Sequence, residues 1–94
     1  MNTLDFNLRP KLAAHVRLKI DPVTGEAVLL FPEGLLILNE TAHEIARRCD
    51  GQTSISKLAE DLAGEFDADK DLLLEDIRDN LEQLRQRNLL IFSP

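Results

Sequence analysis

The side chains that could act as nucleophiles or metal ligands are few and widely spaced: one cysteine, Cys49, and two histidines, His15 and His43. Cys49 falls on the apolar stripe of a predicted helix, where a buried and inert thiol is the expected state. His15 is predicted on the outer face of a strand and His43 on the outer face of a helix, and neither has a cysteine or histidine at metal-ligand spacing. We therefore expect no metal site.

The remaining groups that take part in catalysis are equally dispersed. The acidic residues fall on solvated helix faces, whereas acid–base work by paired carboxylates needs burial to shift a pKa. The glycines are isolated turn and cap residues, so no glycine-rich loop is available to hold a phosphate. Ser54 precedes a helical pattern as a capping residue and lacks the Asp-Ser-Leu context of an acyl carrier protein. The sequence thus predicts a binding module that holds no cofactor and is not an enzyme.

These dispersed groups belong to a chain of 94 residues, which is enough for one domain. The single cysteine allows no internal disulfide, which favours a reducing compartment. The N-terminus lacks the apolar segment of a signal peptide, and no apolar run approaches the ~20 residues that span a membrane. We therefore expect a soluble, cytoplasmic protein that does not bind membranes.

Charge is unevenly distributed along the chain, whose net charge is −6. Residues 1–20 carry a net charge of +3, and residues 21–94 carry −9. The acidic body repels a phosphate backbone, so we expect no nucleic-acid partner. The basic residues of the first segment are Arg9, Lys11, Arg17 and Lys19. They either contact an acidic partner, such as an enzyme or an acidic stretch of a peptide, or only solvate an exposed surface.

The first half of the domain predicts three antiparallel strands over 14–20, 27–31 and 35–38. Polar and apolar residues alternate in the first strand, which points Val16, Leu18 and Ile20 inward. A loop over 21–26 and a tight Pro-Glu-Gly turn over 32–34 make the three strands a meander. Residues 1–13 show no steady period, so we expect a flexible N-terminal arm followed by a single domain over 14–92.

The second half predicts three helices near 40–49, 55–65 and 70–87. Their N-caps are Asn39, Ser54, and either Asp67 or Asp69. Gly51 and Asn88 are expected to end the first and third helices in left-handed conformations, and residues 89–92 to pack back as an extended tail. The predicted fold class is α+β: a three-stranded antiparallel sheet followed by a three-helix bundle, similar to a winged helix.

Strands 27–31 and 35–38 are apolar on both faces, which is unusual for a small antiparallel sheet. Strand 35–38 is also the last of the meander and has no Lys or Pro to block pairing at its edge. The third helix has a wide apolar stripe. This combination predicts a site at which an extended peptide adds a fourth strand. The site comprises Leu35, Leu36, Ile37, Leu38, Leu74, Arg78, Leu81 and Arg85. The alternative is that the apolar excess only fills a self-contained core, and the pattern alone leaves both open.

Two other classes of function remain as alternatives. A winged-helix-like fold suggests a DNA-binding or regulatory domain, but the third helix, which would read the major groove, is rich in Asp and Glu. A purely structural dimerisation module is the other alternative. The open strand edge also predicts that the chain can form a homodimer when no peptide is bound.

Four segments at defined spacing carry a family resemblance: Leu30-Phe31-Pro32-Glu33-Gly34, Leu38-Asn39, Cys49-Asp50-Gly51 and the helix over 55–66. In this combination the chain resembles the PqqD family from Pro10 to about Phe92. Phe31 is a departure, because a Tyr often precedes Pro-Glu-Gly in the family.

The resemblance implies a function. PqqD proteins are peptide chaperones in the biosynthesis of pyrroloquinoline quinone (PQQ). They bind the precursor peptide PqqA and present it to the radical S-adenosylmethionine (SAM) enzyme PqqE. They are similar to the recognition elements of other ribosomally made, modified peptides (RiPPs), which hold leader peptides against the third strand and third helix. The resemblance therefore implies the same surface as the strand edge and apolar stripe.

Overall fold

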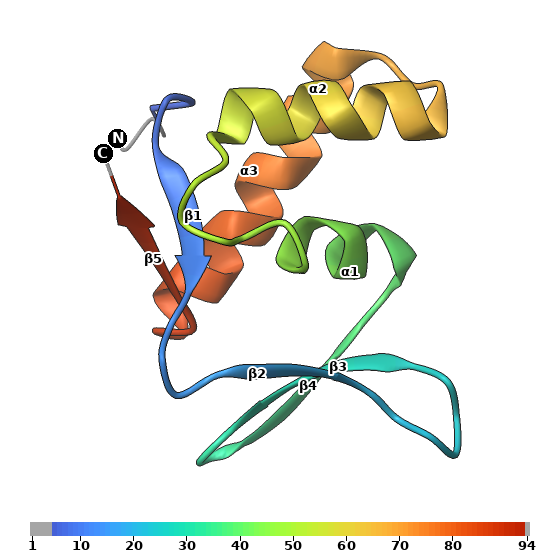
Figure 1. The fold of residues 1–94 in the computed structure, drawn as a ribbon, viewed down its shortest axis with the longest axis vertical. Helices are drawn as coiled ribbons and strands as arrows, with labels where there is room; N and C mark the ends of the chain where they lie inside the picture. Colours follow the sequence, from blue (N-terminus) through green and yellow to red (C-terminus); the bar gives the residue numbers. More distant parts are fainter. Residues whose placement is uncertain (1–4, 94) are drawn as a thin grey trace.

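The three predicted strands form one antiparallel sheet in the computed structural model, which describes residues 5–93 (Figure 1). The strands are β2 (Arg17–Ile20), β3 (Ala27–Phe31) and β4 (Gly34–Leu38), in the order β2-β3-β4. Arg17 pairs with Leu30 in β2–β3, and Leu30 pairs with Leu35 in β3–β4. The predicted meander is therefore confirmed, and β2 and β4 are its two edges.

The three helices also lie where the caps and periodicity predict them. They are α1 (Glu40–Ala46), α2 (Ile55–Phe66) and α3 (Lys70–Gln86). The side chains of Asn39, Ser54 and Asp69 accept hydrogen bonds from backbone N–H groups of the first turns, which would otherwise lack partners. Asn88 has positive φ directly after the end of α3, as expected of a helix-ending residue. Gly51 also has positive φ, but α1 already ends at Ala46, so Gly51 lies in the following loop and does not end that helix as predicted. The α+β fold class is thus confirmed.

The N-terminal segment differs from the expected flexible arm, because Arg9–Leu12 form a strand, β1. β1 pairs antiparallel with β5 (Leu90–Ser93), which is the predicted extended tail, and Pro10 faces Phe92. Pro10 is fully buried. The strand was missed because four residues that include a proline give no period, and their partner lies at the other end of the chain. Residues 1–4 of the expected arm lie outside the described residues.

The same segment is also bound on its other side. The backbone N–H of Leu12 donates to Cys49 O, and that of Gly51 donates to Pro10 O. At the start of α2, the N–H groups of Ile55 and Ser56 donate to the carbonyls of Leu8 and Phe6. Residues 6–12 therefore join the loop before α2 to the C-terminal strand, and they satisfy N–H groups that a helix start leaves free.

One hydrophobic core joins the sheet to the helices. Leu29 of β3, Ile45 of α1, Leu58 of α2 and Ile77 of α3 are fully buried in it. Ile20, which alternation predicts to point inward, is instead 52% exposed. The reason is that α1 packs on β3 and β4 and leaves the end of β2 uncovered. Within the described residues, no helix combines the length and apolar character needed to cross a membrane.

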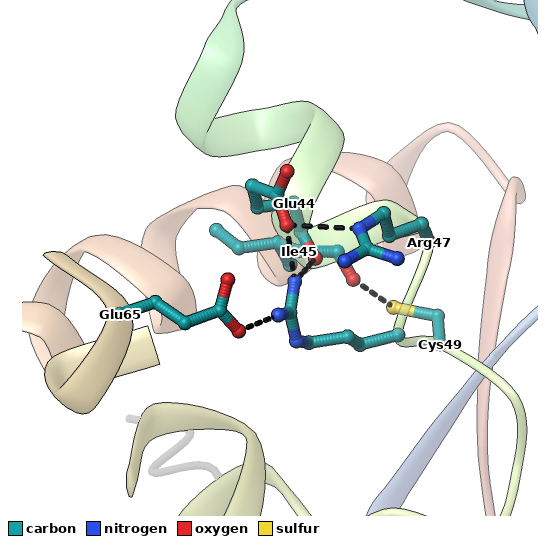
Figure 2. Close-up of polar contacts among 6 residues, drawn as sticks. Glu44, Ile45, Arg47, Cys49 and Glu65 are labelled. Atoms are coloured by element: carbon teal, nitrogen blue, oxygen red, sulfur yellow. Dashed lines mark hydrogen bonds and ion pairs between the residues drawn. The ribbon is translucent and has the colours of Figure 1, made fainter. Parts of the chain in front are cut away.

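An ion-pair cluster connects the end of α1 with α2 (Figure 2). The Arg48 guanidinium contacts the carboxylates of Glu44 and Glu65 and also donates to the Glu44 carbonyl at 3.0 Å. Arg47 donates to Glu44 at 2.8 Å. Hydrogen bonds from Arg47 and then Arg48 hold the pKa of Glu44 below its usual value of 4.5. The charged form of Glu44 is therefore favoured by folding.

Replacing Glu44 with Gln is expected to lower the free energy of unfolding at neutral pH by about 1 kcal/mol, since a charge-assisted hydrogen bond is lost. Because the pKa of Glu44 is depressed in the folded state, its contribution is present above pH 4.5 and is lost as pH falls below that value. Denaturant melts at pH 7 and at about pH 3 should show the two proteins converging in acid. Glu75→Gln is the control, since Glu75 forms no ion pair with any other residue of the described range.

Candidate functional site

The edge of β4 presents free backbone groups at two alternate residues. Phe31 and Gly34 pair across a two-residue turn, so they form the first hydrogen-bonded pair of the β3–β4 ladder. Hydrogen-bonded and non-hydrogen-bonded pairs then alternate, which leaves the N–H and C=O of Leu35 and Ile37 directed at the open edge. The backbone N–H of Asp21 donates to Glu26 O at 2.8 Å, which agrees with the same alternation of hydrogen-bonded and non-hydrogen-bonded pairs between β2 and β3.

The four predicted site residues of β4 divide between the two faces of the sheet. Leu36 and Leu38 point inward, where Leu38 is buried in the core and Leu36 packs against it. Leu35 and Ile37 point to the opposite, outer face and are 55% and 56% exposed. A strand added at this edge would therefore place alternate side chains beside the core and beside the outer face.

The four predicted residues of α3 are only partly available. Leu81, which is predicted as a peptide-site residue, is fully buried in the core and is not available to a peptide at the surface. Its side chain turns inward because α3 packs on α2 and β5. Leu74 is half-buried against the core. The Arg78 guanidinium lies 3.6 Å from the Asp79 carboxylate. Arg85 forms a bidentate ion pair with Glu82, in which its guanidinium donates to the two carboxylate oxygens at 2.8 and 2.9 Å.

The structure does not bring the two predicted halves of the site into extensive contact. β4 packs mainly on β3 and α1, whereas α3 packs mainly on α2 and β5. Figure 1 shows α1 next to the sheet and α2 beyond it. The halves are linked through the shared core, to which Leu36 of β4 and Leu74 of α3 both contribute. The open β4 edge is thus the more complete part of the predicted site.

A groove on the outer face of the sheet was not identified as a site from the sequence. Its volume is about 330 Å³, and its lining residues come from all three strands and the β2–β3 loop: Lys19, Ile20, Asp21, Pro22, Glu26, Val28, Leu30, Leu35 and Ile37. The sequence pattern that could have indicated this groove is the apolar character of strands 27–31 and 35–38 on both faces. The helices cover only the inner face, so the outer face is open.

The two pairs of basic N-terminal residues lie on different strands. Arg9 and Lys11 occupy β1, and Arg17 and Lys19 occupy β2. All four are exposed, and none forms an ion pair with another residue in the range 5–93. By contrast, Arg48, Arg78 and Arg85 are paired with carboxylates.

Cys49 is buried, as its position in the sequence predicts. Its thiol donates to the Ile45 carbonyl at 3.3 Å (Figure 2), and burial raises the pKa of Cys49 to about 12. The thiol is therefore protonated at neutral pH and is a poor nucleophile. Among the described residues, no group of three His, Cys, Asp or Glu side chains is arranged to hold a metal ion.

The fold and the open edge define a small α+β domain of the winged-helix-like class. The chain matches the family model described as "Coenzyme PQQ synthesis protein D (PqqD)" over residues 26–90. The chain therefore belongs to the PqqD family.

Relatives and solved structures agree with this assignment. A protein of Rhizobium meliloti named "PqqA binding protein" is 39% identical over 85% of this chain and 82% of its own length. A protein of the same name from Xanthomonas axonopodis pv. citri is 38% identical over 96% of this chain and 98% of its own length. The solution structure of the PqqD truncation of Methylobacterium extorquens PqqCD, described as a functional and stand-alone RiPP recognition element, has a TM-score of 0.77 and 34% identity over 87% of both chains. The crystal structure of Xanthomonas campestris PqqD has a TM-score of 0.59 and 37% identity, over 93% of this chain and 97% of that one.

Proposed function

We propose that this chain is a non-catalytic peptide chaperone of PQQ biosynthesis, which binds the precursor peptide PqqA and presents it to the radical SAM enzyme PqqE in the cytoplasm. The observation that carries the proposal is the open β4 edge, at which Leu35 and Ile37 direct unpaired backbone groups outward. Family membership and the names of the relatives supply the identity of the peptide.

Binding by strand addition explains why an enzyme would use a separate chaperone. A disordered peptide loses conformational entropy when it becomes ordered, and main-chain hydrogen bonds to β4 offset part of that cost away from the catalytic site. The tethered peptide then reaches the enzyme at a raised effective concentration. The two halves of the proposed site differ in role. The β4 edge forms main-chain hydrogen bonds with the peptide. Arg78 and Arg85 of α3 leave Asp79 and Glu82 and pair with acidic groups of the peptide instead.

Titration of isotopically labelled chain with PqqA peptide, followed residue by residue by NMR, tests the proposal. The largest shifts are expected at the amides of Leu35 and Ile37, with smaller ones at Leu74, Arg78 and Arg85. Shifts clustered on α2 would place the peptide elsewhere. Absence of any shift at high peptide concentration would remove the proposed function. Duplex DNA titrated at physiological salt is the control for the winged-helix alternative, and no binding is expected because the chain is acidic.

The open edge also predicts self-association of the chain when no peptide is bound. An apolar edge without a blocking residue is a template for a second copy. The turn over 32–34 and the junction at Asp50 and Gly51 are short enough to act as hinges for exchange of an element. Light scattering at rising protein concentration should show dimers, and PqqA peptide should return them to monomers. A dimer that survives while binding one peptide per chain would show that the dimer contact lies elsewhere.

A further inference from the structure

The outer face of the sheet β2–β3–β4 is chemically distinct from the edge to which the peptide is assigned. On this face, β3 contributes Val28, which is buried, and Leu30 beside it. The strand β4 contributes Leu35 and Ile37, which are more than half exposed. The cross-strand pairs place Arg17 beside Leu30, and Lys19 beside Val28. The result is an apolar groove that Lys19 lines on its β2 side, with Arg17 beside Leu30 just outside the lining residues.

A sheet face and a sheet edge take different kinds of occupant. The backbone groups of β3 are used in ladders with β2 on one side and β4 on the other. The face therefore offers side chains alone, and it cannot hold an extended segment by main-chain hydrogen bonds as the β4 edge can. A groove of about 330 Å³ fits a few apolar side chains that project from a helix or loop of a folded partner.

Charge specifies the partner further. Arg17 and Lys19 form no ion pair with residues 5–93, although the chain as a whole has a net charge of −6. The acidic residues that line the groove, Asp21 and Glu26, lie in the loop that joins β2 to β3, next to Lys19 and away from Arg17. The Asp21 carboxylate already accepts the N–H of Val23 at 2.8 Å. A partner with acidic side chains over the Arg17 end and none over the loop end would match this distribution.

We propose that the outer face of the sheet docks the peptide-modifying enzyme, through a surface helix or loop that carries apolar side chains flanked by acidic ones. This inference rests on the proposed function. It separates the two tasks of the chaperone: the β4 edge holds the peptide, and the adjacent face holds the enzyme. The peptide is thereby bound at the border of the enzyme interface.

The test compares three variants in two separate binding measurements, one with PqqA peptide and one with PqqE. R17E/K19E reverses both cations, and L30T shortens an apolar side chain on the central strand, away from the edge. R87E is the matched control, because Arg87 is exposed at the end of α3 and forms no ion pair within the described part of the chain. R17E/K19E and L30T should each weaken PqqE binding at least about tenfold and leave PqqA affinity within about twofold, while R87E changes neither. Association of PqqE with R17E/K19E should also depend less on salt.

Three results would overturn the inference. Unchanged PqqE binding in R17E/K19E and L30T would show that the face is not used. A parallel loss of PqqA affinity would make the face part of the peptide site instead. A wild-type chain that binds PqqA but never PqqE would remove the enzyme as occupant. Failure of the proposed function itself gives a different pattern, since the wild-type chain would then not bind PqqA. Circular dichroism melts serve as the separate folding check for each variant, so that a loss of PqqA affinity in a folded variant can be assigned to the peptide site.

Discussion

Replacing Ile37 with proline is expected to abolish binding of the PqqA peptide, with a loss of affinity of about 100-fold or more. The N–H of Ile37 is directed at the open edge of β4, so proline removes a donor from the ladder that the peptide would form. The proline ring also occupies space that an added strand needs. Because Ile37 forms a non-hydrogen-bonded pair with Val28, the β3–β4 ladder keeps its own bonds at this position. Isothermal titration with PqqA peptide measures the effect.

The other edge of the same sheet supplies a matched control. Ile20 of β2 pairs with Ala27 of β3 and is 52% exposed, against 56% for Ile37. Asp21 and Glu26 next to this pair are hydrogen-bonded, so Ile20 and Ala27 form a non-hydrogen-bonded pair. The N–H of Ile20 therefore also faces away from the sheet. Ile20→Pro should retain peptide affinity. Equal losses in both variants would indicate a general effect on the sheet, and a loss in Ile20→Pro alone would move the peptide to β2. A third variant, Ile37→Thr, keeps the N–H and should bind.

Local signals in the sequence predict most of this fold. Asn39, Ser54 and Asp69 begin the helices because a short polar side chain there satisfies N–H groups a few residues away. Alternation likewise locates β2, and short apolar runs bounded by turn residues locate β3 and β4, each to within a few residues. These elements are determined by interactions between residues close in sequence, which a single sequence displays directly.

The site was harder to predict, since exposure depends on which elements cover which face. The apolar excess of β3 and β4 was visible, but the sequence does not show that α1 covers only the inner face of the sheet. Leu81 illustrates the same difficulty: it lies on the apolar side of α3, and only the packing of α3 on α2 and β5 determines that it is buried. The pairing of Arg85 with Glu82 three residues earlier follows helical spacing and could have been found.

Deleting residues 1–13 is expected to unfold most of the domain, which is the reverse of what the expected flexible arm implies. The deletion removes β1, the fully buried Pro10, and the partly buried Phe6 and Leu8. Apolar burial of this extent contributes on the order of 5 kcal/mol, which is comparable to the whole stability of a small domain. It also leaves β5 without a partner strand and the first N–H groups of α2 without acceptors. Loss of the cooperative thermal transition in circular dichroism is the expected result.

Two further measurements separate this cause from a general sensitivity to changes at the N-terminus. Arg9→Ala alters an exposed residue of β1 and should retain the thermal transition of the full chain. Adding a synthetic peptide of residues 5–13 to the truncated chain should restore part of the transition, because the segment binds by backbone hydrogen bonds on both of its sides. A truncated chain that melts like the full chain would mean that the contacts of β1 add little to stability. Residues 1–13 would then be the dispensable arm that their sequence suggests.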